Sequence, residues 1–280
     1  MSALSHFGKA IALLAMCVAP PALPAPTTEA VDLELVIASD NSQSIDPTEA
    51  ALERQGVAAA FRNDDVVKAI QSGSLGKIGV AYLDWSSAPY TRIVLDWRII
   101  EDKKSADAFA AALLAAAPPY GRGTAIGEAI SIAARMIESN TLQGTQRVID
   151  VAGDGPNNRG RPVALVRDEV VAHGITINGL PIVVTGEYGT GDWGAYYGKL
   201  DEYYMNCVIG GRGSFSIPAR GFQDFANAVR RKLILEISGD IPLTPHGETG
   251  AIVKVAAPAP SASTQNCISD YRGFGGFGNF

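Results

Sequence analysis

Positive charge, histidine and cysteine are all scarce in this sequence. The 280 residues include 23 Lys and Arg against 29 Asp and Glu, which gives a formal net charge of −6. No basic stripe of the kind that binds phosphate is visible, so the composition argues against nucleic acid as a partner. Of the three histidines, only His173 and His246 lie beyond the first 25 residues. Two histidines do not favour a Ser-His-Asp triad or a His-based zinc site.

Two common nucleotide and hydrolase motifs are also missing. The sequence contains no Walker A loop and no Gly-x-Ser-x-Gly elbow. Residues 121–127 (GRGTAIG) resemble a dinucleotide-binding loop, but the third glycine falls one position late and no suitable strand precedes the loop directly. Nucleotide binding is therefore not expected.

Long apolar runs are absent after the first 25 residues. No later segment has the about 18–20 continuous apolar residues that a membrane span needs. At the start, Lys9 precedes an apolar stretch over residues 10–18 and then small residues and prolines, which is the layout of a secretory signal peptide. We expect residues 1–25 to be this signal, with cleavage after Ala25 (or after Ala22 or Ala30), and the mature protein to be exported, either periplasmic or secreted.

A lipoprotein anchor on Cys17 is disfavoured, because Met16 stands where such a motif has a small residue. Cys207 and Cys267 are then the cysteines of the mature chain. In an oxidising compartment an even number suggests one disulfide, but two free thiols or pairing with another chain remain open.

The body of the chain alternates strand and helix patterns. Strand patterns occupy residues 33–39, 77–85, 91–99, 147–153 and 175–183. Helix patterns occupy residues 46–61, 105–117, 124–139, 162–174 and 221–237. This order predicts an α/β fold with a doubly wound, mostly parallel sheet, helices on both faces and one antiparallel edge strand at the hairpin of residues 77–99. The predicted domain covers residues 26–239, and residues 240–280, rich in Pro, Ala and Gly, are expected to form a flexible tail.

Oxygen-bearing side chains follow the ends of two predicted strands and precede one helix. Asp40, Ser42 and Ser44 leave the first strand at alternate positions, and alternating residues project to the same side. Thr124 follows two glycines at a helix start, and Asp154 ends a later strand. Because ligands of doubly wound sheets bind outside the carboxyl ends of the strands, these side chains are expected to converge. A hard cation such as Mg²⁺ prefers oxygen ligands, so we predict a metal site at Asp40, Ser42, Ser44, Thr124 and Asp154.

Asp-x-Ser-x-Ser, then Gly-Thr, then a strand ending in Asp-Gly, in this order, resembles the von Willebrand factor A domain over residues 31–238. The resemblance implies a metal-ion-dependent adhesion site for Mg²⁺ (or Mn²⁺ or Ca²⁺), with hydroxyl ligands from Ser42, Ser44 and Thr124. Asp40 and Asp154 would act largely through water, and a protein partner's Asp or Glu carboxylate would fill the sixth position. The segments VDLELVIASDNSQSID and RVIDVAGDGPNNRG, with the later CVIGG, look like a bacterial exported family of this fold whose function is unknown.

The sequence departs from the resemblance at Gln43, where the pattern usually has glycine; this side chain either crowds the loop or faces solvent. The favoured function is an exported binding module without enzymatic activity. The alternative is a metal-dependent hydrolase of the cell envelope, which needs a general base such as Asp84 or Glu187. A third reading is an envelope-structure protein whose metal only ties three loops together.

Three further features stay open. Trp85 and Tyr90 either contact a partner or, for Trp85, fill the core beneath the loops. Residues 187–207, rich in Tyr and Gly, form either a recognition surface or a packed irregular crossover. Asp150 lies in a strand, and it either orients a loop or pairs with an arginine such as Arg159.

Overall fold

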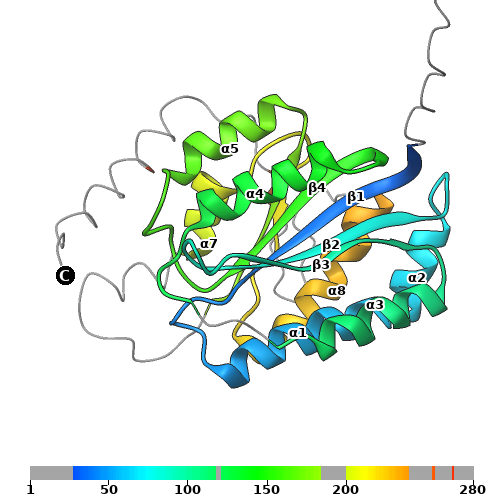
Figure 1. Cartoon of the computed structure of the whole chain (residues 1–280), viewed down its shortest axis with the longest axis horizontal. Helices are drawn as coiled ribbons and strands as arrows, with labels where there is room; N and C mark the ends of the chain where they lie inside the picture. The colour runs from blue at the N-terminus through cyan, green and yellow to red at the C-terminus, as the bar shows by residue number, and fades with distance from the viewer. Residues whose placement is uncertain (1–27, 118–120, 184–199, 240–253, 256–266, 268–280) are drawn as a thin grey trace, which may run out of the picture.

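A computed structural model describes residues 28–117, 121–183 and 200–239, together with residues 254–255 and 267. Seven strands form one sheet in the order β3-β2-β1-β4-β5-β6-β7. The strands are β1 (Glu29–Asp40), β2 (Ile78–Trp85), β3 (Arg92–Ile100), β4 (Leu142–Gly153), β5 (Thr176–Pro181), β6 (Phe215–Ser216) and β7 (Lys254–Val255). Their arrangement confirms the predicted mostly parallel sheet (Figure 1).

Helices cover both faces of this sheet, as the alternating pattern predicts (Figure 1). They are α1 (Pro47–Phe61), α2 (Asp64–Gln71), α3 (Lys103–Ala115), α4 (Ile126–Ser139), α5 (Val163–Ala172), α7 (Leu200–Tyr203), the π-helical turn η1 (Tyr204–Val208) and α8 (Phe222–Ser238). Helices α1, α2, α3 and α8 lie on one face, while α4, α5 and α7 lie on the other. Within the described ranges, no helix has the length and apolar character needed to cross a membrane.

Each face of the sheet has its own hydrophobic core. Alternate residues of β1 point to opposite sides, so Leu35 and Ile37 join the core beneath α1 and α8, whereas Val36 and Ala38 join the core beneath α4 and α5. This is why β1 reads as a continuous apolar run: a central parallel strand is buried on both faces.

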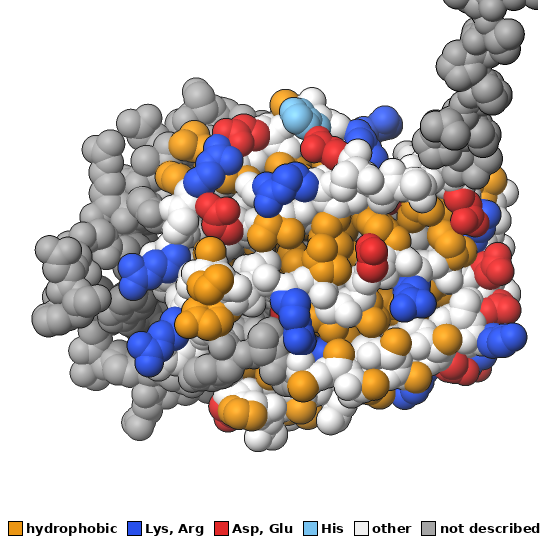
Figure 2. Space-filling model, viewed as in Figure 1, with side chains coloured by type: hydrophobic (Ala, Val, Ile, Leu, Met, Phe, Trp, Pro, Cys, Tyr) orange, Lys and Arg blue, Asp and Glu red, His pale blue; other side chains and the backbone are white. Residues whose placement is uncertain are grey.

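The predicted hairpin supplies the edge of the sheet at one end. Strand β3 pairs antiparallel with β2, with Asp84 opposite Arg92, and it is half exposed along its length. The face that carries this edge shows hydrophobic side chains separated by single charged ones (Figure 2). Charged side chains on β3, such as Asp96 and Arg98, disfavour pairing with another chain at an open edge.

The helix start at residue 46 is confirmed in detail. The Asp46 carboxylate accepts hydrogen bonds from the backbone N–H groups of Thr48 and Glu49, and the Glu49 side chain accepts from the Asp46 N–H, which completes a capping box. Such a cap orients the first turn of α1 and therefore the loop that leaves β1.

Five short elements were not predicted from the sequence: α2, α7, η1, β6 and β7. Helix α2 has only 8 residues, too few to show a clear helical repeat of apolar residues. Strands β6 and β7 have two residues each. Strand β7 pairs antiparallel with β6, so part of the expected tail adds a strand to the sheet. The expected signal peptide and most of the tail lie outside the described residues.

Asp150 pairs with Lys232, a partner that was not predicted from the sequence. Its carboxylate forms a buried ion pair with Lys232 of α8 and not with Arg159. Lys232 Nζ also donates to Glu236 Oε1 (2.5 Å), and Asn178 Nδ2 donates to the same oxygen (2.6 Å). Two carboxylates thus share one ammonium group inside the protein. Burial, and then the charge of Glu236, raise the pKa of Asp150 to about 7.

This cluster predicts a specific pH dependence of stability. The Asp150 carboxyl titrates near pH 4 when unfolded but at about 7 when folded. Between these values the native state binds a proton that the unfolded state has lost, so the free energy of unfolding falls as pH rises. Asp150→Asn keeps an oxygen that accepts from Lys232 and removes the titration. We expect urea denaturation from pH 4 to 7 to show that the free energy of unfolding falls less steeply with pH in this variant than in the wild type. The two slopes should differ by up to about 1.4 kcal/mol per pH unit. Parallel pH profiles for the two proteins would contradict the assignment.

Candidate metal site

The loop after β1 turns back on itself around the Asp40 side chain. Asp40 is fully buried, and its Oδ1 accepts from the Ser42 backbone N–H (2.8 Å). The Ser42 and Ser44 hydroxyl oxygens share a hydrogen bond of 2.9 Å, and Ser44 Oγ donates to Asp154 Oδ1 (2.7 Å). The loops after β1 and β4 therefore meet through these serines, although they lie more than a hundred residues apart in the sequence.

Thr124 lies next to the loop that follows Asp154. Its backbone N–H donates to Asn158 Oδ1 (2.9 Å), and its hydroxyl oxygen accepts from Asn158 Nδ2 at 3.4 Å. A Cβ atom built on Gly155 would stand 3.9 Å from Thr124 Oγ1. The structure thus brings all five predicted side chains to neighbouring positions at the carboxyl ends of β1 and β4.

These strands flank the point where the sheet changes direction. From β1 the chain crosses to β2 on one side, and β4 pairs with β1 on the other side. Doubly wound sheets bind ligands at such a switch point because the connecting loops separate there. The polar cluster therefore lies at the place where folds of this kind bind ligands.

Two acidic groups face each other in this cluster. Burial, and then the negative charge of Asp154, raise the pKa of Asp40 well above its usual range. Burial raises the pKa of Asp154 to about 6, although the hydrogen bond from Ser44 opposes the shift. Asp40 Oδ2 is buried, and none of the described residues forms a hydrogen bond with it. Ionising both carboxylates is costly unless positive charge enters the cluster.

Residues that the sequence analysis did not single out hold the loops in place. Asn41 Nδ2 donates to Asp84 Oδ1 (2.8 Å), and the Asn41 backbone bonds to Trp85 and Gly121. Arg54 forms a buried ion pair with Asp84 and donates to the Ala116 carbonyl (2.8 Å). The Arg54–Asp84 pair could not be predicted, because nothing in the sequence around Arg54 indicates that this position of α1 faces β2.

A third carboxylate lies close to the cluster. Glu53 of α1 is 1% exposed and accepts a hydrogen bond from the Ser39 hydroxyl group. Burial raises its pKa, and the charges of Asp40 and Asp154 raise it further. The site is therefore surrounded by more buried acidic groups than basic ones.

Asn157 orders the loop after β4. Its Oδ1 accepts from the Gly127 N–H (3.1 Å) at the start of α4, and its Nδ2 donates to the Arg161 carbonyl (3.2 Å). Its own backbone N–H donates to the Tyr203 hydroxyl (3.1 Å). The loop is thus fixed from both α4 and α7.

Several open alternatives are settled by burial. Trp85 is completely buried in the core beneath α4 and α5, so it fills the core, while Tyr90 is 43% exposed. Gln43 is exposed and does not crowd the loop. Asp84 is buried and held by Arg54 and Asn41, which makes it a poor general base for the hydrolase alternative. Glu187, the other suggested base, lies outside the described residues.

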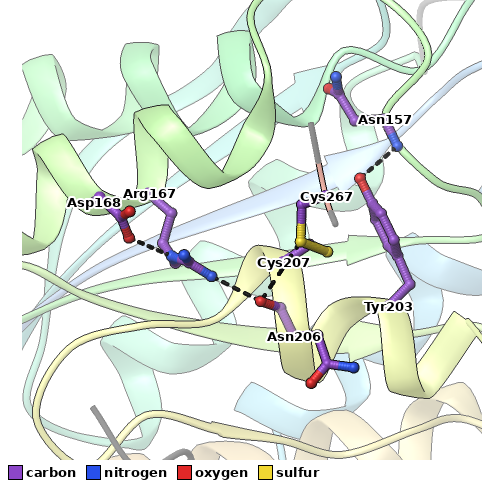
Figure 3. Close-up of a disulfide and its surroundings, with 7 residues drawn as sticks. All are labelled: Asn157, Arg167, Asp168, Tyr203, Asn206, Cys207 and Cys267. Carbon is purple, nitrogen blue, oxygen red and sulfur yellow. Dashed lines mark hydrogen bonds and ion pairs between the residues drawn. A yellow bond between two sulfur atoms is a disulfide. The ribbon is translucent and has the colours of Figure 1, made fainter. Parts of the chain in front are cut away.

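The cysteines form a disulfide between Cys207 and Cys267, with their Cα atoms 5.7 Å apart (Figure 3). Within the described residues, no cluster of three or more His, Cys, Asp or Glu side chains is arranged to bind a metal. The candidate site differs from such clusters in composition, since it combines two carboxylates with three hydroxyl groups.

The Arg54–Asp84 pair yields a test of the framework. In Arg54→Met, Asp84 keeps Asn41 but loses the charge that compensates its burial, and such losses cost about 3–5 kcal/mol. Arg92→Met is the matched control, because Arg92 Nη2 lies 3.8 Å from the same carboxylate but its side chain is 49% exposed. The control should cost less than about 1 kcal/mol. Chemical denaturation of both variants measures the difference, and equal losses would contradict the assigned role of Arg54.

Comparison with solved structures supports the fold. The pilus adhesin SpaC from Lactobacillus rhamnosus GG aligns over 75% of this chain and 32% of its own, with a TM-score of 0.53 and 12% identity. The chain thus spans about a third of that adhesin. A von Willebrand factor type A structure from Catenulispora acidiphila aligns over 74% of this chain and 43% of its own, at a TM-score of 0.45 and 14% identity.

A third structure is proximal thread matrix protein 1 from the mussel byssus with a zinc-occupied MIDAS motif. It aligns over 76% of this chain and 49% of its own, at a TM-score of 0.46 and 14% identity. No curated protein sequence matches the chain. A family model described as a protein of unknown function (DUF1194) matches residues 30–241. The chain has a von Willebrand factor A-like fold and belongs to the DUF1194 family.

Proposed function

We propose that this chain is an exported binding module that holds a divalent cation, Mg²⁺ or else Mn²⁺ or Ca²⁺, and uses it to engage a carboxylate of a protein partner. Ser42, Ser44 and Thr124 would supply hydroxyl oxygens, and Asp40 and Asp154 would supply negative charge, largely through water. The observation that carries the proposal is the hydrogen-bonded chain from Ser42 through Ser44 to Asp154, beside the partnerless Asp40 Oδ2.

The donor set fits a hard cation. All candidate ligand atoms are oxygens, which Mg²⁺ and Ca²⁺ prefer. The serine hydroxyls bond to each other and to Asp154, so these oxygen atoms lie close together. A bound cation would offset the burial and the repulsion from Asp154 that together raise the pKa of Asp40.

The same donor set favours binding of an outside carboxylate. The three proposed direct ligands are neutral hydroxyl groups, and the two carboxylates act largely through water, so a bound cation stays electrophilic and attracts a further anionic oxygen. Asp84 is occupied by Arg54 and Asn41, so a binding function is preferred to hydrolysis. The expected signal peptide and the Cys207–Cys267 disulfide support an exported location, because disulfides persist in oxidising compartments.

Replacement of the Asp40 carboxylate by an amide should stabilise the fold and at the same time abolish cation binding. In Asp40→Asn, the buried negative charge next to Asp154 disappears. We therefore expect a higher free energy of unfolding in EDTA at pH 7 than for the wild type, since a carboxyl with a raised folded pKa destabilises the native state above its unfolded pKa. Addition of Mg²⁺ should raise the Tm of the wild type through preferential binding to the native state, but not that of the variant.

Asp46→Asn is the matched control for this experiment. Asp46 lies on the same loop, but its carboxylate caps α1, and asparagine caps helices comparably well. This variant should keep the Mg²⁺-dependent rise in Tm. A wild-type Tm that ignores Mg²⁺, Mn²⁺ and Ca²⁺ at millimolar concentration would refute the metal site.

The partner interaction has its own test. Immobilised wild-type protein should retain a partner from a cell-envelope extract in Mg²⁺ and release it in EDTA, whereas Asp40→Asn should retain none. In the captured partner, a single Asp→Asn or Glu→Gln change at the contact should reduce binding at least tenfold. Retention that persists in EDTA would show that the cation does not bridge the two proteins.

A further inference from the structure

Tyr204 is a completely buried tyrosine whose hydroxyl group has no hydrogen-bond partner among the residues that the structure describes. It belongs to the segment Leu200–Val208, formed by α7 and η1 and called here the tyrosine turn. A buried hydroxyl without a partner costs free energy, so its position needs an explanation that packing alone does not supply.

Two strand glycines make room for this side chain. A Cβ on Gly179 of β5 would lie 2.8 Å from Tyr204 Cδ1, and a Cβ on Gly153 of β4 would lie 2.9 Å from the Tyr204 hydroxyl oxygen. Glycine inside a strand weakens it and often marks a close approach. Both strands therefore lack a side chain where the Tyr204 ring and hydroxyl group pass.

The hydroxyl group is directed to the candidate metal site. The same Cβ position on Gly153 lies 3.1 Å from Asp40 Oδ2, the carboxylate oxygen without a partner. The Tyr204 hydroxyl oxygen, from the tyrosine turn, and Asp40 Oδ2, from β1, thus both lie close to this one position. One is a donor and the other an acceptor.

We propose that Tyr204 is a positioning residue for the metal site, whose hydroxyl group donates to Asp40 Oδ2 through one water and orients this carboxylate toward the cation. The inference rests on the proposed metal site and adds a residue to it. Groups that hydrogen-bond to metal-binding carboxylates fix their orientation, and their loss typically weakens metal affinity by about 10–100-fold.

The protonation state of Tyr204 suits this role. Burial, and then the negative charge of Asp40, raise the pKa of the phenol well above its usual range. The hydroxyl group therefore keeps its proton over the physiological range and remains a donor.

The tyrosine turn is fixed firmly enough to position a side chain. Arg167 Nη1 of α5 donates to the Asn206 carbonyl (2.9 Å), the disulfide joins Cys207 to Cys267, and the neighbouring Tyr203 hydroxyl accepts from the Asn157 N–H (Figure 3). Thus one short segment contacts the loop after β4 through Tyr203 and approaches Asp40 through Tyr204.

Tyr204→Phe tests the inference by removing only the hydroxyl group. We expect isothermal titration of the full mature chain with Mg²⁺, and with Mn²⁺, to give about tenfold weaker binding than for the wild type. Cation addition should also change the near-ultraviolet tyrosine spectrum of the wild type, and most of this change should be lost in the variant. A purely structural role would leave both readouts unchanged.

Tyr82→Phe is the matched control. Tyr82 is also completely buried with a partnerless hydroxyl group, but it lies near Asp84 and Glu53 instead of Asp40. The Tyr82→Phe variant should bind Mg²⁺ and Mn²⁺ as tightly as the wild type. The inference would be overturned, with the metal site intact, if Tyr204→Phe bound the cation as tightly as the wild type. It would also be overturned if Tyr204→Phe and Tyr82→Phe lost the same cation affinity. If the wild type binds no cation, the proposed metal site itself is wrong and the inference falls with it.

Gly179→Ala offers a second test should Tyr204→Phe fold poorly. The added methyl group would lie 2.8 Å from Tyr204 Cδ1, closer than real contacts allow, so the ring must shift while all polar atoms remain. Weaker Mg²⁺ binding than in the wild type supports the inference, and unchanged binding contradicts it.

Discussion

The architecture around the site depends on two carboxylates that the fold forces together away from water. Asp40 and Asp154 end neighbouring parallel strands, and the loops that follow them are joined by the serine hydroxyls. Burial, and then the repulsion between them, make ionisation of Asp40 costly. The proposed cation would offset this cost.

The surrounding framework keeps that cost from disrupting the fold. Arg54 compensates Asp84, Lys232 compensates Asp150 and Glu236, and each pair links a helix to the sheet or joins positions within one helix. No comparable basic side chain is paired with Asp40 among the described residues. Asp84, Asp150 and Glu236 thus each have a basic partner, whereas the proposed function assigns compensation of Asp40 to a cation from outside.

The sequence predicted the central sheet, the helices that cover both faces and the set of five side chains, because each depends on local signals. Apolar runs mark buried strands, Asp46 marks a helix start, and polar residues after strands meet at one edge of a parallel sheet. It did not predict the pairing of Arg54 with Asp84, the partner of Asp150 or the approach of Tyr204 to Asp40. The first two contacts join residues 30 and 82 positions apart, and Tyr204 lies 164 positions from Asp40 in the sequence. No local pattern encodes which buried positions face each other. Gly153 and Gly179 were the available signal for Tyr204, since each is a missing side chain inside a strand.

The direction of β1 has a practical consequence for attaching this protein to a surface or a fusion partner. Strand β1 begins at Glu29 and ends at Asp40, and 12 extended residues span about 40 Å. A linker joined ahead of Glu29 therefore leaves from the pole opposite the candidate site and presents that site outward. Cys267, by contrast, is bonded to Cys207 on the tyrosine turn, so a label that requires a free Cys267 thiol would break the covalent bond that holds the segment carrying Tyr204.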